Sequence, residues 1–125
     1  MKIWKSLFRA TALAIALLAS TKGFAEEKVF NLHLTNGRLP ENQRVIRVTK
    51  GDNVKWEVVS DAPGELHLHA YHLSLHLNPG ETSDLSFQAF ATGRFRMEWH
   101  PATSSNKKND FHHEDKLASF EVMPK

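Results

Sequence analysis

A tight turn runs directly into an alternating strand in the stretch Thr49-Lys50-Gly51-Asp52-Asn53-Val54-Lys55-Trp56-Glu57-Val58. Gly and Asp are typical turn residues, and the residues that follow them alternate between apolar and polar. Side chains two positions apart on a strand lie on the same face, so Val54, Trp56 and Val58 are expected to share a buried face. The opposite face is polar, which is typical of an antiparallel sheet with one side toward solvent.

The same alternation recurs along the rest of the chain. Further strands are predicted at residues 29–34, 45–49, 84–90, 94–100 and 117–122. Clusters of Gly, Pro, Asn and Asp separate them about every ten residues, and no helical periodicity follows residue 25. This pattern predicts an all-β fold, either a β-sandwich or a small barrel. The polar segment 101–114 is long for a connection in so small a domain, so we expect it to carry function.

The segment 66–77 departs from this regularity. Its apolar residues fall on even positions at Leu66 and Leu68 but on odd positions from Leu73 onward. An extra residue near Ala70 would produce such a change of phase, so we predict one strand with a β-bulge, a feature common beside metal and active sites. The polar face would then carry a row of histidines: His67, His69, His72 and His76.

The histidine and cysteine contents limit the kinds of metal site that the chain can form. The 125 residues include eight histidines and no cysteine. Imidazole is the commonest side-chain metal ligand, whereas disulfides, iron–sulfur clusters and thiolate-ligated blue copper all need cysteine. The chain is therefore a candidate histidine-only metal protein.

The N-terminus has the pattern of a secretory signal peptide. Lys2, Lys5 and Arg9 precede an apolar run at residues 11–19, and small residues follow before Glu26. The run is too short to span a bilayer, so we predict a cleaved leader at residues 1–25, a periplasmic or secreted location and no stable membrane insertion after cleavage. An uncleaved signal anchor is the alternative.

The predicted mature chain, residues 26–125, is long enough for one domain with a single core. Four of the 16 basic residues lie in the leader, so 12 basic residues remain against 14 acidic ones, a formal charge of about −2. A protein that binds nucleic acid is usually strongly basic, so this charge gives no indication of nucleic-acid binding.

From Val45 to Val122 the chain resembles the cupredoxins, which are Greek-key β-sandwiches that carry copper. The resemblance rests on the order of four features: the stretch quoted above, a histidine in the following strand, the turn at residues 78–81, and Thr92-Gly93-Arg94-Phe95 before a strand end. It is strongest to cysteine-free periplasmic members with Glu-Leu-His-x-His-x-Tyr, here residues 65–71, and a Glu-x-His strand end, here residues 98–100.

The resemblance implies a position for each copper ligand. His69 matches the first cupredoxin histidine, while the strand end where a cysteine is expected offers only Trp99 and His100. A blue-copper electron-transfer site is therefore excluded. The cupredoxins keep later ligands in the loop that follows, where this chain has His112 and His113.

Residue spacing gives a candidate site. His67 and His69 are separated by one residue, so on a strand their β-carbons would lie about 6 to 7 Å apart on one face. His100 is the expected third ligand, and His112 or His113 would complete the shell. Copper(II) leads the affinity order for such a nitrogen site, and zinc is the second possibility. The alternation around His100 is a difficulty for this choice. It puts His100 with Arg94, Arg96 and Glu98 on the face opposite Phe95, Met97 and Trp99, unless the strand twists or bulges at its end.

The remaining candidates have simpler explanations. His33, His72 and His76 are expected on the surface, and Met97 and Trp99 are expected in the core. Glu65 and Glu98 would accept hydrogen bonds from ligating imidazoles and orient them.

The function expected from these features is metal binding, most consistent with periplasmic copper handling or tolerance. The partners would be the metal ion and another periplasmic protein. We do not expect an enzyme, because no nucleophile triad, paired-carboxylate or phosphate-loop signature is present. The alternative is a metal-free β-sandwich interaction module whose histidines only decorate the surface.

Overall fold

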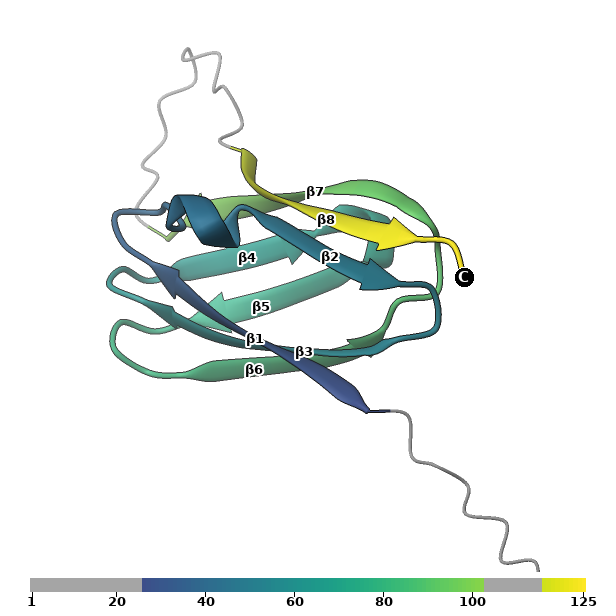
Figure 1. Cartoon of the computed structure of the whole chain (residues 1–125). Helices are drawn as coiled ribbons and strands as arrows, with labels where there is room; N and C mark the ends of the chain where they lie inside the picture. The colour runs from purple at the N-terminus through teal and green to yellow at the C-terminus, as the bar shows by residue number, and fades with distance from the viewer. Residues whose placement is uncertain (1–25, 103–115) are drawn as a thin grey trace, which may run out of the picture.

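The computed structural model describes residues 26–102 and 116–125, which form two β-sheets packed face to face (Figure 1). The smaller sheet has the order β1-β3-β6 and the larger one β2-β8-β7-β4-β5. The predicted leader and both His112 and His113 lie outside the described residues. The strands of the smaller sheet are β1 (Glu27–Leu34), β3 (Asn53–Ser60) and β6 (Ser83–Gln88); those of the larger are β2 (Val45–Thr49), β4 (Gly64–Leu68), β5 (Leu73–Leu77), β7 (Gly93–Pro101) and β8 (Lys116–Met123).

The strand pairing confirms the predicted all-β sandwich. The pairs β1–β3 and β2–β8 are parallel, and the other pairs are antiparallel. Because β1 and β3 lie in one sheet while β2 lies in the other, the chain crosses between the sheets twice in its first three strands. Two 3-10 turns, η1 (Glu41–Gln43) and η2 (His69–Tyr71), complete the described elements. Among the described residues, no helix is long and apolar enough to cross a membrane.

The core lies between the two sheets and follows the alternation read from β3. Val54, Trp56 and Val58 are completely buried. The Trp56 ring packs edge to face against two phenylalanine rings. The centroid distance is 4.9 Å to Phe87 in its own sheet and 5.5 Å to Phe120 in the opposite sheet. Aromatic pairs in this geometry add to the stabilisation from burial alone, so Trp56 joins the two layers.

The prediction of one bulged strand over residues 66–77 is wrong, because the chain reverses there. β4 and β5 form an antiparallel hairpin around η2, and His72 follows the turn with a left-handed backbone (φ 53°). Leu66 pairs with Leu75, and residues directly opposite in a sheet lie on the same face. An even-numbered face in β4 therefore continues as an odd-numbered face in β5, which explains the change of phase. The turn contains none of the residues that usually announce a hairpin.

Tyr71 fixes this turn to the rest of the sandwich. Its side chain is buried, and its hydroxyl donates to the carbonyl oxygen of Ala91 at 2.8 Å and accepts from the N–H of Ala91 at 3.1 Å. The ring centroids of Phe90 and Phe95 lie 4.4 and 5.3 Å from the ring centroid of Tyr71. Since η2 includes His69, these contacts also hold that histidine in place.

Candidate metal centre

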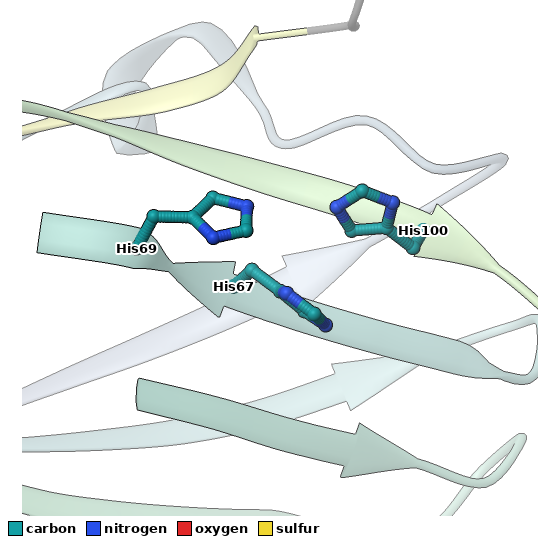
Figure 2. A group of neighbouring side chains, drawn as sticks. All are labelled: His67, His69 and His100. Atoms are coloured by element: carbon teal, nitrogen blue, oxygen red, sulfur yellow. The ribbon is translucent and has the colours of Figure 1, made fainter. Parts of the chain in front are cut away.

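Three histidines meet on the outer face of the larger sheet, above β4 and β7 (Figure 2). The antiparallel register sets His67 opposite Glu98 and Glu65 opposite His100, while His69 begins the turn after β4. One ring nitrogen from each of His67, His69 and His100 lies within 4.8 Å of the other two. The structure thus brings together the three histidines that the sequence selected.

The strand alternation that counted against His100 places it correctly. In β7, Met97 is fully buried, so Glu98 and His100 point outward, to the same side as His67. The pairing of β7 with β8 is irregular between Met97 and Glu98. Met97 pairs with Ala118 but Glu98 pairs with Lys116, so the extra residue lies in β8 and not in β7. The alternation of β7 therefore continues to its end, and His100 points with Glu98 as the alternation predicted, without a bulge in β7.

Gly64 allows β4 to approach β7 closely at the end that carries His100. A β-carbon at Gly64 would lie 2.5 Å from the backbone oxygen of His100 and 2.7 Å from the indole ring of Trp99. Trp99 packs inward against the core, as predicted for it and for Met97. The tryptophan thus occupies the inner side of the strand end where a cupredoxin would carry cysteine, and the histidines occupy the outer side.

Two carboxylates contact the three imidazoles. The Oε2 atom of Glu65 lies 2.7 Å from Nε2 of His67, and this hydrogen bond lowers the pKa of the Glu65 carboxyl. The Oε2 atom of Glu98 lies 2.7 Å from Nε2 of His69 and 3.4 Å from Nε2 of His100. The glutamates expected to lie beside ligating imidazoles are thus in contact with them.

Two further histidines lie near the centre without joining it. His76 faces Glu65 across the β4–β5 hairpin, with its Nδ1 atom 4.0 Å from Oε1, and His72 is exposed beside the turn. The residue opposite His67 on β5 is Ser74, whose hydroxyl lies 3.4 Å from the histidine Nε2 atom. The predicted row of four histidines is therefore wrong, because it assumed one continuous strand. Ser74 was missed, since only the hairpin register brings it to the site.

The remaining candidate histidines are His33, His112 and His113. His33 is exposed on β1, in the opposite sheet, as predicted for a surface residue. His112 and His113 lie outside the described residues, so their part in the site stays a prediction.

The donor set fits a copper(II) or zinc(II) ion. The side chains of His67, His69 and His100 are 24, 61 and 49% exposed, so an ion reaches them from solvent without opening the core. Metal–imidazole bonds are about 2 Å long, so the nitrogens of one ion are about 3 to 4 Å apart. Small rotations of the side chains suffice to bring the present spacing to that distance. Three imidazoles suit either ion, and copper(II) is the more tightly held of the two.

Comparison with solved structures identifies the fold. The chain is similar to a blue copper oxidase from Nitrosomonas europaea, with 20% identity and a TM-score of 0.59 over 80% of this chain and 40% of that one. A copper-containing nitrite reductase from Thermus scotoductus SA-01 gives 20% identity and a TM-score of 0.57 over 80% of this chain and 28% of that one. The periplasmic domain of cytochrome oxidase subunit II from Bradyrhizobium japonicum gives 13% identity and a TM-score of 0.55 over 78% and 84% of the two chains.

These proteins share the cupredoxin fold. The present chain has that fold in a cysteine-free form, as the sequence resemblance predicted. It spans less than half the length of the oxidase and the reductase but most of the subunit II domain. No protein-family model and no curated protein sequence matches it.

Proposed function

We propose that this protein binds copper, as copper(II), through His67, His69 and His100, and serves in copper handling or tolerance outside the cytoplasm. The observation that carries the proposal is the convergence of three imidazole nitrogens within 4.8 Å on one face of a cupredoxin-fold domain. The absence of cysteine argues against a blue-copper electron carrier.

Several features support copper over other ions. The similar solved structures include a blue copper oxidase and a copper-containing nitrite reductase. Copper(II) also leads the affinity order for nitrogen ligands among the divalent first-row ions, and zinc(II) is the second candidate. We include His112 or His113 in the proposal as a further ligand, since the loop after β7 begins beside His100.

The proposal is for binding and not for catalysis. The three histidines lie on the surface of a sheet, and a hollow of about 200 Å³ elsewhere on the molecule is lined by Arg38, Arg44, Lys116 and neighbouring residues, none of them histidine. A substrate-binding enzyme would need its reactive groups to meet in such a hollow. The predicted leader at residues 1–25 supports export of the protein, and a second protein outside the cytoplasm would receive the ion.

Calorimetric titration of the mature protein with copper(II) and zinc(II) tests the proposal. We expect one copper(II) per chain with a dissociation constant below about 1 μM, and loss of this binding in the His67→Ala, His69→Ala double variant. His33→Ala is the matched control, because it removes an exposed histidine from the opposite sheet. Equally weak binding by wild type and double variant would contradict the proposal and favour a metal-free interaction module.

A further inference from the structure

The carboxylate of Glu98 lies between two of the candidate ligands. Its Oε2 atom is 2.7 Å from Nε2 of His69 and 3.4 Å from Nε2 of His100. The two imidazole side chains point toward one another in Figure 2, with their ring planes at 90°. The Nε2 atoms of His69 and His100 thus lie beside the same carboxylate oxygen. An ion bound to both of them would also be within reach of this oxygen.

Glu98 is a largely buried carboxylate, with Lys116 opposite it on β8 and two imidazoles in direct contact. Its side chain is only 11% exposed, and its ion pairs within residues 26–102 and 116–125 are with the imidazoles of His69 and His100. A neutral imidazole that donates a hydrogen bond from Nε2 to the carboxylate does not cancel its charge; a ring that binds an ion through Nε2 carries its proton on Nδ1 instead, so that the carboxylate then faces the ion. Burying a carboxylate is costly unless a cation accompanies it. A divalent ion at the histidines would supply that cation.

We propose that Glu98 is itself a metal ligand, and that its anionic oxygen makes the centre select a divalent ion over copper(I). This inference rests on the proposed function, because it assumes that the histidines bind copper. Three neutral imidazoles alone hold copper in either oxidation state, whereas a carboxylate oxygen is a hard ligand that suits the divalent ions. The complete donor set is then three nitrogens and one oxygen.

Glu65 has a different part in the same centre. It contacts His67 at Nε2, its side chain is 46% exposed, and its Oε2 atom is also 3.4 Å from the hydroxyl of Ser74. A carboxylate bound to one ring nitrogen fixes the orientation of the ring and leaves the other nitrogen for the ion. Glu65 is therefore a positioning residue, whereas Glu98 contacts the Nε2 atoms of two of the three candidate ligands, His69 and His100.

The Glu98→Gln variant separates ligation from positioning. The amide keeps the size of the side chain and an oxygen that accepts hydrogen bonds from the imidazoles, but it loses the charge. We expect copper(II) affinity, measured by competition with a chromophoric chelator, to fall about 100-fold. Copper(I) affinity, measured the same way under reducing conditions, should stay within about threefold. The electron paramagnetic resonance spectrum of the copper(II) form should shift as one oxygen donor is replaced.

Two further variants complete the test. Glu57→Gln is the matched control, because Glu57 pairs with Lys55 on the opposite sheet, and its copper affinities should equal those of wild type. Glu98→Asp keeps the charge but shortens the side chain by one carbon, so copper(II) affinity should fall while the charge in the sheet is preserved. It serves as the second test if the glutamine variant does not fold.

The outcomes are distinct. Unchanged copper(II) affinity in Glu98→Gln would overturn the inference and leave the three-histidine proposal standing. Equal losses for copper(I) and copper(II) would also overturn it, because they would show that Glu98 only positions the imidazoles. A wild-type protein that binds neither ion would refute the proposed function itself.

Discussion

Replacing Gly64 with alanine should weaken both the sandwich and the metal centre. The added β-carbon would lie 2.5 Å from the backbone oxygen of His100, whereas a carbon–oxygen contact is ordinarily no shorter than about 3.3 Å. A backbone oxygen cannot rotate away. The nearby indole of Trp99 cannot move freely either, because its other edge is already packed close to Gly37. β4 and β7 must therefore separate by roughly 0.8 Å at this point.

The size of the effect follows from this forced separation. Overpacking of this kind costs about 1 to 3 kcal/mol, and the clash with backbone places Gly64→Ala toward the upper end. The smaller conformational entropy of alanine in the unfolded chain offsets about 0.5 kcal/mol. We expect a net loss of about 2 kcal/mol in the free energy of unfolding, which lowers the melting temperature by roughly 10 °C in a domain of this size. Since His100 moves with β7, copper(II) affinity should fall about tenfold.

Urea denaturation followed by tryptophan fluorescence, together with copper(II) calorimetry, checks both parts. Gly80→Ala is the control: no atom lies within 4 Å of the added carbon, although its backbone, unlike that of Gly64, has a positive φ of 75°. It should lose about 1 kcal/mol through backbone strain and keep its copper affinity. A Gly64→Ala protein with wild-type stability and copper affinity would refute the claim that β4 and β7 are in close contact beside the site.

Three more predictions concern the turn, the sheet surface and the ion. Tyr71→Phe removes both hydrogen bonds to Ala91 and should cost about 1 to 2 kcal/mol in urea denaturation; an unchanged midpoint would contradict the role of the hydroxyl in fixing η2. The hydrogen bond from Arg47 lowers the pKa of the Glu121 carboxyl, so this contribution to stability is present above the unfolded-state pKa of about 4.3 and disappears as pH falls through the folded-state pKa. Arg47→Gln should therefore be less stable than wild type at pH 7, and the two should converge in acid denaturation; a gap that stays constant to pH 2 would refute the assignment. Copper(II) affinity should fall steeply below about pH 6.5, because imidazole must lose its proton to bind, and a flat profile down to pH 5 in calorimetry would exclude histidine ligation.

Most strand positions and the chemistry of the site could be predicted from the sequence, except for the hairpin at residues 66–77. Alternation depends only on neighbours in the chain, so the buried faces of β3 and β7 followed from Val54, Trp56 and Met97 directly. The absence of cysteine excluded a thiolate-bound copper centre, and the His-x-His pair with His100 named three of the residues that now lie together. His112 and His113 remain predictions from the sequence alone.

The pairing of strands was decided by the tertiary structure. The same change of phase in residues 66–77 fits a bulge or a reversal, and only the packing of both leucine faces on one core selects the hairpin. The contacts of Glu98 with His69 and His100 likewise depend on the register of β4 against β7. That register is set by contacts between residues that are far apart in the sequence. The alternation of apolar and polar residues is a local property of each strand. The register of two paired strands is determined by the hydrogen bonds and side-chain contacts between them. The sequence therefore determined which residues face outward, and the assembled sheet determined which of them touch.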